Sequence, residues 1–150
     1  MVFKVKFVIF AAEILTISCM MTKEQYIDHW ITTAAEDWIT VEVMLEGKRY
    51  MHCLFWAHLV LEKLAKAHWV KAHTDNIPPR VHNIVWLLEE SNVDLGIEMM
   101  EYLANFNKFQ LSTRYPDYID NIFHVCTREL TLQEIEKVKE VRTCLLKMLS

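Results

Sequence analysis

The stretch from Arg49 to His73 constrains the fold more than any other, because it is apolar on nearly every side of a helix. Its hydrophobic residues follow one another over several turns: Leu54, Phe55, Trp56, Leu59, Val60, Leu61, Leu64, Trp69 and Val70. A helix of this kind has to be covered on most sides. We therefore expect it to lie at the centre of a helical bundle or in an interface between subunits.

An amphipathic segment precedes this central helix. Its apolar residues recur in steps of four and three, as on one face of a helix: Ile27, Ile31, Ala34, Trp38, Val41 and Leu45. Gly47 is expected to end this helix in a left-handed conformation. The sequence Thr22-Lys-Glu is a good helix start, so we expect the domain to begin near Thr22.

The second half of the chain is interrupted by turn signals. Two prolines in the segment 75–79 predict a break after the central helix. Gly96 is expected to weaken one of the later helices, and residues 111–117 are expected to form a polar loop. Thr131 and Glu134 have the spacing of a capping box, which predicts the start of the last helix. Three shorter helices are expected before it, over residues 81–91, 94–108 and 118–129.

Composition favours one all-helical domain. The chain has 150 residues, of which 53% are hydrophobic, enough for a single sizeable core. It has only two glycines and three prolines, and no segment alternates with period two. We therefore predict an all-α fold, an antiparallel bundle of about five helices over residues 22–150.

Residues 1–21 differ from the rest of the chain. Lys4 and Lys6 precede an apolar run that Glu13 interrupts, and Ser18-Cys19 loosely resembles a lipoprotein cleavage site. The run is too short and too charged for a transmembrane span. Three interpretations stay open: an upstream extension with a misassigned start, an ordered extra helix, and a true signal segment.

Charge and cysteine usage narrow the classes of function. A net charge of −4 argues against electrostatic nucleic-acid binding by the whole chain, although it leaves a local basic groove open. The four cysteines contain no Cys-x-x-Cys pair, which argues against a zinc site and a disulfide framework. We expect reduced thiols, a cytoplasmic protein that does not enter a membrane, and no metal or other cofactor.

No complete catalytic motif is present. Gly47 and Gly96 cannot form a glycine-rich phosphate loop. No histidine follows a glutamate by three residues, as a di-iron bundle requires, and His-Glu-x-x-His is absent. Nothing in the sequence places a serine nucleophile on a sharp turn.

A polar stripe on the central helix is the first candidate site. His58, Glu62 and Lys66 follow one another in steps of four and lie on one face. Because a buried polar group without a partner costs about 1–3 kcal/mol, these side chains need partners or water. Two explanations stay open: a solvated strip or internal hydrogen-bond ladder, and a groove that binds a phosphate or a partner.

Two further clusters lie in the connecting segments. Arg114 and Tyr115 precede Pro116, and Asp117 follows it, so we expect a stiff turn here. Two roles of the Arg114 guanidinium stay open: bidentate binding of a phosphate, and an ion pair with a carboxylate at a helix entry. His82-Asn83 opens the third helix, where capping is the simpler role and ligand binding the alternative.

These clusters, taken in order, resemble the HEPN family of nucleotide-binding helical domains found in higher eukaryotes and prokaryotes. The resemblance covers about Thr22 to Leu149 and draws its specificity from the order and spacing of the motifs. The matching segments are Ala34–Asp37, Leu45–Tyr50, Phe55–Ala67, Pro79–Asn83 and Arg114–Asp117.

The resemblance implies a bundle of about five helices. It also implies a homodimer and, as partner, a minimal nucleotidyltransferase in a toxin–antitoxin-like pair. Many members are ribonucleases with an arginine and a histidine about four to six residues apart. No arginine here precedes a histidine at that distance; Lys63 and His68 have it, with lysine in place of arginine.

Three hypotheses follow. The first is a non-catalytic module that binds a nucleotide, RNA or a nucleotidyltransferase; the second is a metal-independent ribonuclease with a non-standard site; the third is a structural interaction domain. For the first, the expected nucleotide-binding residues are His58, Glu62, Lys63, Lys66, His82, Arg114, Tyr115 and Asp117.

Overall fold

The computed structural model describes residues 21–110 and 124–150, and every regular element in these ranges is helical. The predicted all-α class is thereby confirmed. The elements are α2 (Lys23–Glu46), α3 (Tyr50–Ala72), α4 (Ile84–Glu90), α5 (Ile97–Phe106), the 3-10 turn η1 (Asn107–Gln110) and α7 (Arg128–Leu149). None of these helices combines the length and apolar character needed to cross a bilayer.

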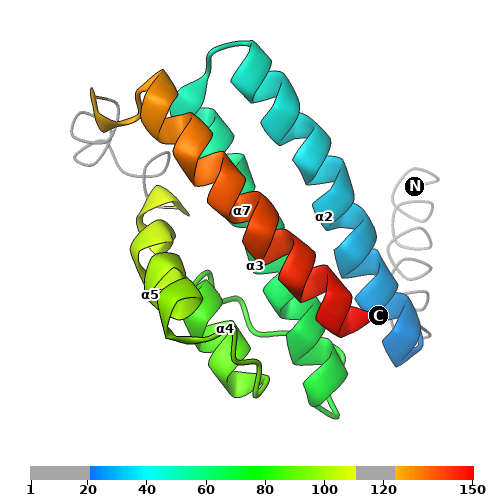
Figure 1. Cartoon of the computed structure of the whole chain (residues 1–150). Coiled ribbons are helices and arrows are strands. Elements are labelled where there is room, and N and C mark those ends of the chain that lie inside the picture. Colours follow the sequence, from blue (N-terminus) through cyan, green and yellow to red (C-terminus); the bar gives the residue numbers. More distant parts are fainter. Residues whose placement is uncertain (1–20, 111–123) are drawn as a thin grey trace, which may run out of the picture.

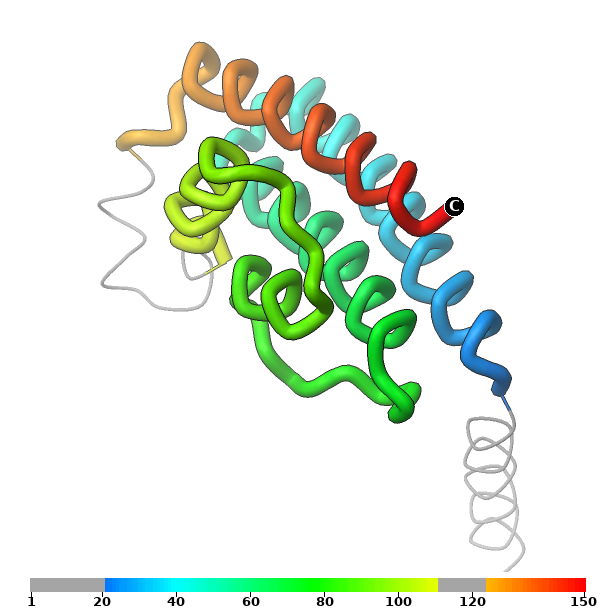
Figure 2. The backbone as a smooth tube through the Cα atoms, turned by 60° about the horizontal axis from the view of Figure 1, so that its bottom comes forward, coloured from blue at the N-terminus to red at the C-terminus, as the bar shows by residue number. Residues whose placement is uncertain are grey.

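The three long helices lie lengthwise beside one another, and the short helices α4 and α5 lie on the side away from α2 (Figures 1 and 2). α2 and α3 are antiparallel, whereas α7 runs in the same direction as α3 (Figure 1). His68 and Lys71 near the end of α3 bond the last carbonyls of α7: His68 Nε2 lies 3.0 Å from Leu145 O, and Lys71 Nζ donates to Met148 O at 3.0 Å.

α2 begins with a capping box and ends in an unexpected way. Thr22 N donates to Gln25 Oε1 at 2.8 Å, and the Thr22 hydroxyl accepts from Gln25 N at 3.3 Å. Gly47, however, has φ −72°, so its predicted left-handed conformation is wrong; Lys48 is left-handed, with φ 57°. A Cβ at Gly47 would lie 3.2 Å from Val43 O, so close packing accounts for the glycine there.

α3 is the buried centre of the bundle, as its apolar character predicts. Leu54 and Val60 are fully buried, and Trp56 and Trp69 are partly buried against the core. α2, α4, η1 and α7 of the same chain pack against α3. Leu54 and Val60 are therefore covered within the chain, whereas Trp56 and Trp69 keep some exposed surface.

The start of α4 follows the predicted capping role of Asn83, whose side chain accepts from Trp86 N at 3.2 Å. Residues 81–83, expected to be helical, are not part of the helix. Gly96 does not weaken a helix from within, because it is the N-cap of α5 with φ +85°. This conformation is incompatible with a right-handed helix, so α5 begins at Ile97.

α7 begins earlier than predicted. Thr127 is the N-cap, and its hydroxyl accepts from Leu130 N at 3.2 Å. The predicted capping box at Thr131 and Glu134 is therefore wrong: Thr131 is buried and donates its hydroxyl proton to Thr127 O at 2.7 Å. The helix expected over residues 118–129 falls mostly outside the described residues, as do the loop 111–117 and residues 1–20.

Candidate functional site

The polar stripe of α3 is the centre of a hydrogen-bond network that includes the segment before α4. Lys66 Nζ donates to Glu62 Oε1 at 2.7 Å. His82 Nδ1 lies 3.2 Å and 3.1 Å from the two carboxylate oxygens of Glu62. His58 Nδ1 is 3.8 Å from Glu62 Oε2. Three of the predicted site residues thus surround the carboxylate of a fourth, Glu62. One of the three, His82, is far from the others in sequence.

The other side of His58 connects the network to η1. His58 Nε2 lies 3.1 Å from Asn107 Oδ1, an acceptor, so that ring nitrogen carries the proton. The same Oδ1 accepts from Ile84 N at 3.1 Å, and Asn107 Nδ2 donates to Asn83 Oδ1 at 2.9 Å. Asn107 therefore fixes the start of α4 against α3. The sequence does not point to Asn107, because nothing near it in the chain predicts these partners.

The members of the network differ in how much of each side chain is exposed to solvent. His58 and Glu62 are 1% and 3% exposed, so they are out of reach of a ligand in solution. Lys66 is 9% exposed, with Nζ 5.4 Å from the centroid of the Trp30 ring. The side chain of His82 is 38% exposed. The network is an internal hydrogen-bond ladder that presents one imidazole, in a fixed orientation, at the surface.

Lys63 is not part of this network. Its Nζ forms an ion pair with Asp37 Oδ2 of α2 at 2.5 Å and donates to Thr33 O at 3.4 Å. Because Lys63 and Lys66 both have partners within the fold, they do not form an open basic cleft. The other three predicted binding residues lie outside the described residues: Arg114, Tyr115 and Asp117.

Arg80 is the cation nearest to His82 in sequence. It is exposed in the segment between α3 and α4, two residues before the imidazole. It forms no ion pair with any residue of the described ranges. Because His82 Nδ1 donates to Glu62, the neutral ring presents Nε2 as an acceptor, and only the doubly protonated ring can donate from Nε2 to a ligand. Arg80 supplies a guanidinium at the same edge of the network, which suits an anionic ligand.

The described residues offer no metal site, and two of their three cysteine thiols are buried and inert. In residues 21–110 and 124–150, no three His, Cys, Asp or Glu side chains are placed to hold a metal ion. Cys53 and Cys126 are free and buried, and burial raises the pKa of Cys53 to about 12 and that of Cys126 to about 11. Neither thiol is ionised at neutral pH, so neither is a ready nucleophile.

Comparison with protein families gives one result. The sequence model of the HEPN domain family matches residues 27–149, which is most of the chain. The match includes all helices of the described ranges except the first turn of α2. Comparisons with curated proteins and with solved structures found no match.

Proposed function

Because the chain belongs to the HEPN domain family, we propose that it is a non-catalytic module that binds a nucleotide or RNA at the exposed edge of the polar network. The observation that carries the proposal is the exposed His82 ring, which the buried Glu62 carboxylate holds in place next to the exposed Arg80. Glu62 orients the His82 ring through Nδ1, so that the protonated ring directs Nε2–H at a phosphate and loses little entropy when it binds. Arg114, Tyr115 and Asp117 are proposed to complete the site.

The ribonuclease alternative has less support. Lys63 and His68 have the spacing of the family's arginine–histidine pair, but Lys63 is bound to Asp37. His68 is buried beside Leu145 O, and burial lowers its pKa, which favours a neutral ring. In this alternative His82 would act as the general acid or base and Arg114 would supply positive charge. Cleavage of a labelled oligoribonucleotide by the purified protein would favour it.

A purely structural role is the second candidate, because the hydrogen bonds of Asn107 hold α3, η1 and α4 together. Replacing His82 distinguishes it from ligand binding. We expect His82→Ala to weaken binding of ATP or of a short oligoadenylate by about tenfold, the loss of one charge-assisted hydrogen bond. Calorimetric titration measures this effect.

The matched control is His52→Ala, because His52 is exposed in the first turn of α3, away from the network. It should leave the affinity unchanged. The melting temperature of each variant is measured alongside, since His82 also bonds Glu62. Unchanged ligand affinity in His82→Ala, together with a lower melting temperature, would favour the structural role.

We also propose two protein partners. The first is a minimal nucleotidyltransferase, with which the chain would form a toxin–antitoxin-like pair in the cytoplasm. This proposal rests on the family alone. Co-purification after co-expression with a nucleotidyltransferase encoded beside it tests the pairing.

The second proposed partner is another copy of the chain. A functional dimer has a dissociation constant of at most roughly tens of micromolar. At that protein concentration we expect light scattering to give twice the 17.8 kDa mass of the chain. A monomer at that concentration would contradict the expected dimer.

A further inference from the structure

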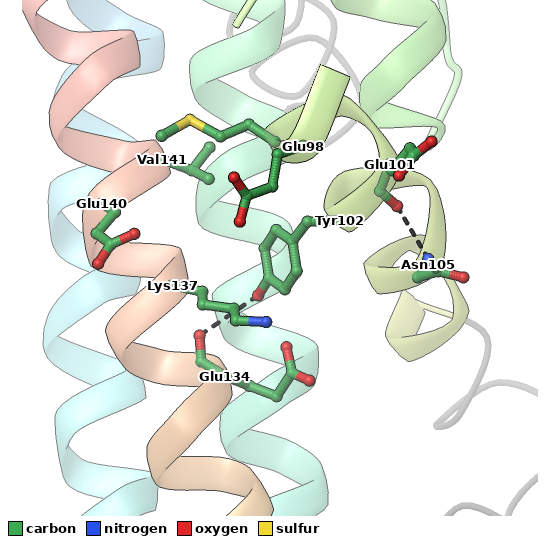
Figure 3. Close-up of a pocket in the computed structure, with 9 residues that line it drawn as sticks. Glu98, Glu101, Tyr102, Asn105, Glu134, Lys137, Glu140 and Val141 are labelled. Atoms are coloured by element: carbon green, nitrogen blue, oxygen red, sulfur yellow. Dashed lines mark hydrogen bonds between the residues drawn. The ribbon is translucent and has the colours of Figure 1, made fainter. Parts of the chain in front are cut away.

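The short helix α5 lies between two cavities with acidic walls. One, of about 430 Å³, lies between α5 and α7 (Figure 3). The other, of about 570 Å³, lies between α5 and the segment that follows α4. Glu101 lines both cavities, and we call the residues that line the two of them the α5 groove.

The charge of the α5 groove is strongly one-sided. Lys137 is the one cation among the residues that line it, beside six carboxylates: Glu89, Asp94, Glu98, Glu101, Glu134 and Glu140. None of the six forms an ion pair within the part of the chain that the structure describes. This surface repels phosphates and attracts cations, the opposite of what the edge at His82 offers.

One carboxylate oxygen in the groove is both buried and without a well-placed donor. Glu134 Oε2 accepts no hydrogen bond of good geometry, although the carboxylate lies close enough to the Tyr102 hydroxyl to help raise the pKa of that hydroxyl, which burial raises most. The nearby Tyr102 hydroxyl donates to the backbone oxygen of Glu134 at 3.3 Å, and Figure 3 shows it directed at that carbonyl. A buried acceptor that lacks a good donor destabilises the fold, and more so when it is charged. A ligand that brings N–H donors to Glu134 would remove this cost.

The groove also has apolar surface. Ile97 is 81% exposed, more than any other large hydrophobic residue in the described ranges. Met99 and Met100 beside it are only partly buried, and methionine side chains adapt to irregular partners. Apolar surface rimmed by charged residues is typical of a protein–protein contact.

We propose that the α5 groove is the docking site for a basic segment of a partner protein, in which lysine or arginine side chains flank an aliphatic anchor. The basic side chains pair with the rim carboxylates and reach Glu134, while the anchor covers Ile97. A small polyamine would satisfy the carboxylates but leave the apolar surface exposed. The site is independent of the proposed nucleotide edge, because it uses other residues and the opposite charge.

The test uses the full chain and a defined probe. The probe is a fluorescein-labelled amphipathic peptide of roughly 14 residues, with leucine on one helical face and lysine on the other. Fluorescence anisotropy gives its affinity, and amide chemical shifts locate it. We expect shifts in α5 and in residues 134–141 of α7, and none in α2. Peptides with glutamate for lysine, or serine for leucine, should bind more weakly.

Two groove variants have matched controls on α2. Ile97→Gln should weaken peptide binding about fivefold or more, as for an interface anchor. The double variant Glu98→Lys/Glu101→Lys should weaken it about tenfold or more through reversed charge. The controls Ile39→Gln and Glu36→Lys alter an exposed isoleucine and an exposed glutamate elsewhere and should bind as the parent does. All five positions are exposed, so each variant should keep the parent's melting temperature.

Several outcomes would overturn the proposal. These are no binding of the peptide, equal losses in groove and control variants, and binding that Ile97→Gln does not affect. Spermine competing at the same affinity as the peptide would point to a small polycation instead. A change of oligomeric state in Glu98→Lys/Glu101→Lys would make the groove an interface between copies of the chain.

Discussion

Glu62→Leu should lower the free energy of unfolding by about 3–5 kcal/mol, the range for breaking a buried ion pair from one side. Glu62 is 3% exposed and is the acceptor for both Lys66 and His82. Without the carboxylate, the Lys66 ammonium remains in a largely buried position, with no anion in contact. Denaturant unfolding monitored by circular dichroism measures the loss.

The double variant Glu62→Leu/Lys66→Met separates the unpaired charge from lost packing. It should recover most of the stability, because replacing both members of a buried pair by apolar side chains is often neutral. Glu36→Leu, on the exposed face of α2, should change stability by less than about 0.5 kcal/mol. A double variant as unstable as Glu62→Leu alone would show that the carboxylate acts mainly through His82 or His58.

Arg114→Ala should weaken binding of ATP or of a short oligoadenylate by about 1.5–3 kcal/mol, roughly ten- to hundredfold. The sequence predicts that Pro116 stiffens a turn carrying Arg114, in which case the guanidinium would lose little entropy when it holds a phosphate. Arg114 lies outside the described residues, and this expectation rests on the sequence.

The matched control for Arg114 is Arg128→Ala, which should have a smaller effect on binding. Arg128 is exposed in the first turn of α7 and has no proline beside it to hold its side chain. Calorimetric titration compares the two variants, and thermal melting is followed in both. A fall in melting temperature for Arg114→Ala, with unchanged affinity for every nucleotide tried, would mean that Arg114 pairs with a carboxylate and stabilises a helix entry.

The helices themselves could be read from the sequence wherever the information is local. The apolar circumference of the segment 49–73 predicted a buried central helix, and α3 is that helix. Thr22 and Asn83 are caps whose bonds reach only three residues along the chain. Signals of this kind depend on periodicity and on nearest neighbours, both of which the sequence contains.

Competition between equivalent local signals was decided by packing. Thr127 and Thr131 can both cap a helix, and only the position of α7 against α3 leaves Thr131 buried inside the helix. Likewise, of the neighbours Gly47 and Lys48, it is Lys48 that takes the left-handed conformation. A side chain at Gly47 would bring its Cβ close to Val43 O, which accounts for a glycine at that position. Neither outcome follows from residue preference alone.

The candidate site depended still more on tertiary structure. The sequence placed His58, Glu62 and Lys66 on one face, but Asn107 joins them from η1, and Lys63, one position after Glu62, is bound to α2 instead. The partner of a buried polar group is fixed by which helix packs over it, often many tens of residues away. The α5 groove likewise exists only because α4, α5 and α7 bring their carboxylates together. Periodicity determined which side chains turn inward, and helix packing determined what they meet there.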